Sequence, residues 1–169
     1  MTHEEFEKAA YYWDNKEQTA MPEEALKQAV LKYIGENNTC ALATGTGDYV
    51  RCTPIEYSFH DGKFWMFSEG GRKFIGLEKN SHVCLAIYDK YDGFGNLRSL
   101  QVTGIAAMVE PFSEEYNAHA AFKKIPLDAL KKLPSPMNLF CVTPTRIDAL
   151  FSDFKKDGYS VRQVLHQLA

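Results

Sequence analysis

The chain has 169 residues, of which 45% are hydrophobic and 24% charged, and these fractions are typical of one globular domain rather than a disordered or multidomain chain. Its net charge of -3 provides no general basic surface, so nucleic-acid binding is not expected. No apolar run approaches the ~20 residues of a membrane span, and the first residues lack the layout of a signal peptide. We therefore expect a cytoplasmic protein with no membrane partner.

The N-terminal part of the sequence predicts two helices. The first starts with a capping box formed by Thr2 and Glu5, and it is expected to end near Gln18. The second starts at Pro22 and ends at or just after Gly35. Its apolar stripe consists of Leu26, Ala29, Val30, Tyr33 and Ile34.

From Thr39 onward, short runs rich in β-branched and aromatic residues predict an antiparallel sheet. The six expected strands are 39–44, 49–59, 63–68, 81–88, 97–109 and 139–151. His60-Asp-Gly62 is a hairpin signal between the second strand and the third. The remaining expected elements are helices at 72–79 and 114–124 and a last short helix capped by Ser160. Helices at the ends and crossings of such a sheet indicate an α+β fold in which the sheet closes into a small barrel.

Cysteine and histidine spacing argues against several kinds of site. Cys40, Cys52, Cys84 and Cys141 lie in apolar runs without a C-x-x-C pair, so buried free thiols are expected rather than zinc ligands or disulfides. The histidines have no metal-ligand spacing, and the sequence contains no serine-hydrolase elbow or P-loop. We therefore expect no metal site, and the catalytic residues are left unassigned.

A candidate phosphate site follows the third expected strand. The strand ends at Ser68, Gly70 and Gly71 permit a tight turn, and Arg72 and Lys73 begin a helix. Backbone N–H groups at a helix start, together with two cations, are a typical way to bind a phosphate. A solvated surface loop is the competing interpretation.

Arg51 on the second strand is another candidate ligand for an anion. It shares a face with Thr53, Ile55 and Tyr57, because alternate residues of a strand point the same way. An arginine among mostly apolar neighbours binds an anionic ligand, or it lies at the strand edge and reaches solvent or a carboxylate such as Glu56. Both interpretations remain open from the sequence.

The fifth expected strand carries candidates for contact with a heterocycle. Ser99 and Gln101 share one face, and the Gln101 amide can donate or accept a hydrogen bond. A glutamine on the sheet surface is the alternative. Gly104 on the same strand indicates that another group approaches the backbone closely.

Several segments follow one another in an order that carries more information than any one of them. They are Asn38-Thr-Cys-Ala-Leu-Ala-Thr44, Val50-Arg-Cys-Thr-Pro-Ile55, Phe64-Trp-Met-Phe-Ser68, Gly71-Arg-Lys73, Leu77-Glu-Lys-Asn80, Val83-Cys-Leu-Ala86 and Gln101-Val-Thr-Gly104. In this order they resemble the pyridoxamine 5'-phosphate oxidase-like, FMN-binding split-barrel family. The resemblance covers about residues 22–155 of a single expected domain, 1–169. It implies a six-stranded antiparallel split β-barrel that forms a homodimer, with FMN at the interface.

The resemblance also implies which residues contact FMN. Arg51, Cys52 and Thr53 match the strand that lies along the flavin, and Phe67 and Ser68 match a contact on the next strand. Arg72 and Lys73 match the phosphate-binding pair. Arg98 and Ser99 lie where the family oxidase has an Arg-Gln pair, and the nearest glutamine, Gln101, lies two positions after Ser99 on the same face.

Two departures from the oxidase bear on the substrate. Glu56 replaces a lysine, and the segment Tyr159-Ser-Val-Arg-Gln-Val-Leu-His166 does not match the oxidase's C-terminal arginine and histidine motif. The resemblance therefore implies that FMN is kept and the vitamin B6 substrate is lost. The expected function is an FMN-dependent oxidoreductase passing electrons from NADH, NADPH or another donor to a small acceptor. The alternatives are a non-catalytic flavin-binding protein with a sensing, storage or stress role, and a split-barrel protein that binds haem or no cofactor.

A half-closed barrel leaves one side of its sheet open. We expect apolar side chains there, among them Tyr57, Trp65, Phe67 and Ile105. An apolar patch of this size on a monomer is unfavourable in water, so two copies are expected to cover it by pairing about a two-fold axis.

Overall fold

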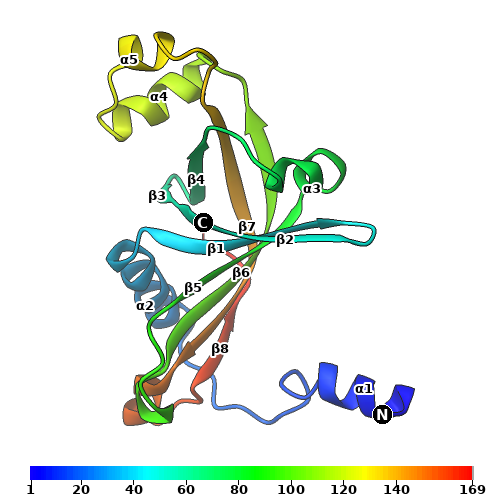
Figure 1. Cartoon of the computed structure of the whole chain (residues 1–169). Helices are drawn as coiled ribbons and strands as arrows, with labels where there is room; N and C mark the ends of the chain where they lie inside the picture. Colours follow the sequence, from blue (N-terminus) through cyan, green and yellow to red (C-terminus); the bar gives the residue numbers. More distant parts are fainter. Residues whose placement is uncertain (169) are drawn as a thin grey trace.

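In the computed structural model, which describes residues 1–168, an antiparallel sheet curls around an apolar core (Figure 1). The strands are β1 (Thr39–Thr46), β2 (Tyr49–Glu56), β3 (Ser58–His60), β4 (Lys63–Ser68), β5 (His82–Tyr88), β6 (Arg98–Val109), β7 (Asn138–Phe151) and β8 (Arg162–Leu165). The helices are α1 (His3–Ala10), α2 (Glu23–Glu36), α3 (Lys73–Lys79), α4 (Glu114–Phe122) and α5 (Leu127–Lys131), with 3-10 turns at Phe94–Asn96 and Ser152–Asp157. The α+β split-barrel fold expected from the sequence is confirmed.

The strand order is β2-β1-β5-β6-β7-β4-β3, and β8 pairs with β7. β2 and β3 are consecutive in the chain but lie at opposite edges of this sheet, so the sheet must curl until its two edges approach. The chain crosses between them at Tyr57, whose N–H donates to the carbonyl of Asn38 and whose hydroxyl donates to the carbonyl of Ile34, at 2.8 and 2.9 Å. The single strand expected at 49–59 is therefore two strands.

The main core lies between the inner face of the sheet and α2. Leu42, Leu85, Val102 and Ile147 stand in register across four strands, and each is at most 1% exposed. Helix α2 adds the predicted stripe, of which Leu26, Val30, Tyr33 and Ile34 are buried and Ala29 is partly buried. Burying a side chain of this size stabilises a fold by roughly 1.5–3 kcal/mol.

A second core lies where β6 and β7 extend beyond the barrel and carry α4 and α5 at their end (Figure 1). It contains Trp65, Tyr116, Leu130 and Leu139. The expected open patch of large apolar side chains is therefore wrong. Trp65 and Tyr57 are 4% and 3% exposed, Ile105 is half-buried, and Phe67 packs beneath α4.

The two ends of the chain differ from their predictions. Helix α1 ends at Ala10 rather than near Gln18, and none of its residues is buried. The expected C-terminal helix is wrong: residues 162–165 form β8, in which burial alternates and Gln163 and Leu165 face inward. The open edge of β7 offers backbone hydrogen bonds, and this pairing overrides the helical spacing of the apolar residues.

The cysteines are all free thiols, but they are not all buried. Cys40 and Cys141 are buried, and burial raises the pKa of the Cys40 thiol to about 12. Cys84 is half-buried. Cys52 is exposed, contrary to expectation, because β2 lies at an edge of the sheet. Within residues 1–168 no helix is long and apolar enough to cross a bilayer.

Candidate functional site

The glycine turn between β4 and α3 is shaped by Ser68. Its Oγ accepts a hydrogen bond from the N–H of Gly70 at 3.2 Å and donates one to the Gly70 carbonyl at 3.0 Å. Gly71 has φ +110°, a conformation that side-chain-bearing residues rarely adopt. The chain therefore reverses sharply, and Arg72 and Lys73 follow at the first turn of α3.

Lys73 is a buried cation without a carboxylate partner. The side chain is 6% exposed, and its Nζ donates to the carbonyl of Gly70 at 2.5 Å. Within residues 1–168 it forms no salt bridge, and burial lowers its pKa. An ammonium group has three donors, and leaving charge and donors unmet in a buried place is costly. An anion with several oxygen acceptors would relieve that cost.

Arg51 and Arg72 are also free of carboxylates. Both are exposed, and in the part of the chain that the structure describes neither guanidinium makes a hydrogen bond or salt bridge. The other arginines are each paired: Arg98 with Glu36, and Arg146 and Arg162 with Asp148. Glu56, the alternative partner considered for Arg51, instead accepts a hydrogen bond from Lys123 at 2.6 Å.

Packing brings Arg51 to the glycine turn. Tyr49 and Arg51 lie on the same face of β2, and the Tyr49 hydroxyl donates to the backbone carbonyl of Arg72 at 3.1 Å. Helix α3 also packs closely against β1, the other strand of the β1–β2 hairpin. A Cβ on Gly76 would lie 3.0 Å from the backbone nitrogen of Gly45. Asn80 adds a hydrogen bond to the Gly45 carbonyl at 3.0 Å. We call the group formed by Arg51, Ser68, Arg72 and Lys73 the cationic corner.

The other predicted contact residues lie elsewhere. Thr53 stands opposite Leu42 on the core side of the sheet, and Phe67 packs edge-on against Tyr116 beneath α4, with 5.3 Å between ring centroids. Cys52, Ser99 and Gln101 lie on the outer side of the sheet. That side, which we call the open sheet face, is formed by Ala41, Ala43, Cys52, Pro54, Cys84, Ala86, Ser99 and Gln101. Within one chain, therefore, Gln101 lies apart from the cationic corner.

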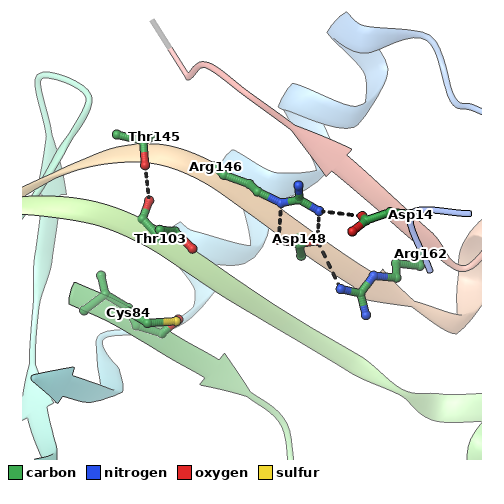
Figure 2. A network of polar contacts seen from close by, with 8 residues as sticks. Asp14, Cys84, Thr103, Thr145, Arg146, Asp148 and Arg162 are labelled. Carbon is green, nitrogen blue, oxygen red and sulfur yellow. Dashed lines mark hydrogen bonds and ion pairs between the residues drawn. The ribbon is translucent and has the colours of Figure 1, made fainter. Parts of the chain in front are cut away.

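Sequence reasoning missed a polar network beside the open sheet face, shown in Figure 2. Asp148, which pairs with Gln101 across the strands, accepts hydrogen bonds from Arg146 at 2.8 and 2.9 Å and from Arg162 at 3.1 Å. Arg146 also reaches Asp14 at 3.4 Å. Burial alone would raise the pKa of Asp148, but the two arginines outweigh burial and hold it below its ordinary value. Only the alternation of Arg146 and Asp148 on one strand hinted at this network.

A second missed cluster joins α4 to the β3–β4 hairpin. His60 Nε2 lies 2.9 Å from His119 Nδ1, and His60 stacks on Trp65 with 4.9 Å between ring centroids. Burial, then the nearby His60 and Lys123, lower the pKa of His119 to about 4. The two histidines are far apart in the sequence, so no local pattern could pair them. No group of three or more potential metal ligands occurs within residues 1–168.

Solved structures of several proteins share this fold at low sequence identity. A FAD-binding protein from Mesorhizobium loti superposes with a TM-score of 0.60 at 16% identity, over 72% of this chain and 90% of that one. The haem storage protein HutZ from Vibrio cholerae gives 0.57 at 20% identity, over 70% and 89%. General Stress Protein 26 from Bacillus anthracis gives 0.59 at 18% identity, over 83% and 98%. A comparison with curated protein sequences found no match.

The family assignment comes from the sequence itself. The family model for pyridoxamine 5'-phosphate oxidase matches residues 26–151, from the first buried residue of α2 to the last residue of β7. This range includes the cationic corner and the strands of the open sheet face. The chain therefore belongs to the pyridoxamine 5'-phosphate oxidase family.

Proposed function

We propose that the protein binds FMN as a homodimer and acts as an oxidoreductase that passes electrons from NADH, NADPH or another reduced donor to a small acceptor. The observation that carries the proposal is the cationic corner. Lys73 is buried with a single carbonyl acceptor, and Arg51 and Arg72 beside it have no carboxylate partner within residues 1–168. Such a set of donors fits a phosphate group, and the cost of leaving an ammonium group buried with unmet donors falls on Lys73.

Each residue of the corner has a distinct task in this proposal. Lys73 supplies a desolvated charge, and the forked guanidinium groups of Arg51 and Arg72 supply paired donors from two elements. Ser68 holds the glycine turn in shape through its two hydrogen bonds with Gly70. Bound FMN supplies hydride and electron transfer, which no side chain of this protein can perform.

A second copy is needed to complete the site. On β1, β2 and β5 the open sheet face carries alanine, cysteine and proline, whereas a solvent-facing antiparallel sheet usually carries polar and charged residues. A second copy packed on this face would bring Cys52, Ser99 and Gln101 of one chain toward the cationic corner of the other. The Gln101 amide would then be available to the edge of the flavin ring.

The position of Arg162 supports the loss of the vitamin B6 substrate. Residues 162–165 are a strand of the sheet, and the Arg162 guanidinium is committed to Asp148 at 3.1 Å. It is not free to bind a substrate phosphate. We therefore expect little or no oxidation of pyridoxamine phosphate.

The test is removal of the two cations at the start of α3. The double variant Arg72→Ala/Lys73→Ala should fold but lose FMN, because charge-assisted hydrogen bonds contribute roughly 1.5–3 kcal/mol each. The matched control, Lys131→Ala/Lys132→Ala, removes the same charge from exposed positions on α5 and should keep FMN. Riboflavin, which lacks the phosphate, should bind the wild type much more weakly. Stoichiometric FMN in the first variant would contradict the proposal.

The visible spectrum separates the alternatives, because flavin and haem absorb differently. The fold is shared with a haem storage protein and with a stress protein, so a haem spectrum or a colourless protein would reject the flavin proposal. If flavin is bound, steady-state oxidation of NADH or NADPH distinguishes an enzyme from a flavin-binding protein without turnover.

A further inference from the structure

Within residues 1–168, packing does not account for the stability of helix α1, because none of its residues is buried. It has eight residues, all exposed, and its apolar side includes Phe6, which is 59% exposed. Its N-terminal capping box is fully formed: Thr2 Oγ1 accepts a hydrogen bond from the N–H of Glu5 at 3.3 Å, and the Glu5 carboxylate accepts one from the N–H of Thr2 at 2.6 Å. Isolated helices shorter than ~12–15 residues are marginal in water even with good caps. Packing against a surface of another molecule would explain why α1 is helical and has an apolar side.

The segment that follows α1 in the chain is anchored to β7, β8 and the turn before β8, and these contacts set the direction in which the helix projects. Asp14 pairs with Arg146 at 3.4 Å, and the Trp13 ring lies 5.5 Å from the Arg162 guanidinium. Thr19 donates its N–H to Ser160 Oγ at 2.9 Å. Figure 1 shows the result, in which α1 stands apart from the sheet on the side toward which the β1–β2 hairpin projects.

The same chain carries an exposed apolar cleft. It has a volume of about 460 Å³ and is lined by Phe74, Ile75, Leu77 and Glu78 of α3 and by Met108 of β6. Ile75 and Met108 are 47% and 54% exposed. The exposed charges around it oppose those of α1: α3 and its cap carry Arg72 and Lys79 against Glu78, whereas α1 carries three glutamates against one lysine.

We propose that α1 is an arm that docks into the α3–β6 cleft of a second copy, an exchange that rests on the homodimer proposed above. In the view of Figure 1, α1 and α3 lie on opposite sides of the β1–β2 hairpin. In that view, a half-turn about an axis normal to the page brings α1 of one copy over α3 of the other. Each copy then gives one arm and receives one, which closes the assembly at two copies. The arm lies next to the partner's cationic corner, because Arg72 begins α3.

The experiment is photo-crosslinking from the arm in the full chain reconstituted with FMN. Phe6→benzoylphenylalanine in a mixture of ¹⁴N- and ¹⁵N-labelled chains should give mixed-isotope adducts within residues 72–79 or at Met108, found by mass spectrometry. The control is Phe94→benzoylphenylalanine, whose side chain is 84% exposed at a distant turn and should give no such adduct. Adducts within one chain, adducts elsewhere on a second chain, or none at all would overturn the arm exchange.

A second measurement keeps the proposal independent of the probe. Met108→Asp should raise the dimer dissociation constant about tenfold or more in sedimentation equilibrium, because a charge would face the apolar side of α1. Phe94→Asp should leave it unchanged, and equal effects of the two variants would overturn the exchange. The flavin spectrum of the same samples separates this proposal from the cofactor: bound FMN without the α1–α3 adduct rejects only the arm, and the adduct in a colourless protein rejects only the flavin site.

Discussion

His119 shows how burial changes the chemistry of one side chain. It is 1% exposed, hydrogen-bonded to His60, and its pKa is lowered to about 4. In the folded protein it is therefore neutral at pH values where an unfolded chain, with a histidine pKa of about 6.5, already takes up a proton. Folding stability associated with His119 is complete above pH ~6.5 and is lost as the pH falls toward ~4.

We predict that the free energy of unfolding falls by about 3 kcal/mol between pH 6.5 and 4, on the basis of the pKa of about 4 for His119. Urea unfolding at a series of pH values measures it. The variant His119→Gln should flatten the profile in this window, whereas His82→Gln, at an exposed position, should not. The paired carboxyl of Asp148 loses its contribution only at lower pH, because its pKa is held below the ordinary value. An unchanged slope in His119→Gln would contradict this assignment.

At the scale of elements, the β6–β7 ladder is interrupted by a bulge. The register shifts between Thr103 and Gly104, and Thr145 is the extra residue on β7. Pro144 beside it has no N–H to donate, and within sheets proline is confined to edges and to bulges of this kind. The Thr145 hydroxyl donates to the Thr103 carbonyl at 3.2 Å and supports the irregular backbone (Figure 2).

Gly104→Ala should therefore destabilise the protein. A Cβ there would lie 2.7 Å from the carbonyl oxygen of Thr143 and 2.7 Å from Val142 Cγ1, so backbone must move. Overpacking of this kind costs about 1–3 kcal/mol, measurable by thermal or urea unfolding. Gly95→Ala is the matched control, because no atom lies within 4 Å of its Cβ position, and it should change stability by less than about 0.5 kcal/mol. Equal effects at both glycines would show that the bulge tolerates a side chain.

At the scale of the whole molecule, Asp148 connects three parts of the chain that are distant in sequence. Through Arg146 and Arg162 it joins β7, β8 and the segment at Asp14 that leads to α1. We expect Asp148→Ala to lower the free energy of unfolding by about 2–4 kcal/mol, because both arginines lose a half-buried partner. Cleavage in residues 10–20 by limited proteolysis should also become faster.

The control for Asp148→Ala is Asp153→Ala, which removes an equally charged partner from an exposed pair with Lys156. Exposed pairs contribute little, so proteolysis and stability should remain near those of the wild type. Similar loss in both variants would mean that the network has no special role in attaching the N-terminal segment.

The cationic corner was partly predictable and partly not. The glycine turn and its two cations are adjacent in sequence, so Ser68 to Lys73 could be recognised as one unit. Arg51 was found as an arginine needing an anion, and its freedom from Glu56 follows from the salt bridge between Glu56 and Lys123. Tyr49 was missed, because its contact with the Arg72 carbonyl depends on how α3 packs against the hairpin.

The sequence by itself determined those helices, turns and strands that depend only on residues close together in the chain. The capping box of α1, the buried stripe of α2, the hairpin at Asp61 and Gly62 and the positions of most strands along the chain all follow from local spacing. Each depends on backbone geometry that the residues prefer by themselves.

Tertiary structure decided what depends on partners distant in sequence. Residues 162–165 became a strand because β7 had an unpaired edge, and α1 stopped at Ala10 because its apolar side met no core. Ser99 and Gln101 shared a strand face in the sequence pattern, but only the pairing of β2, β1, β5 and β6 placed Cys52 on that same face of the sheet. The physical reason is that the free energy of such contacts comes from burial and pairing between segments, which the residues on either side of a position do not determine.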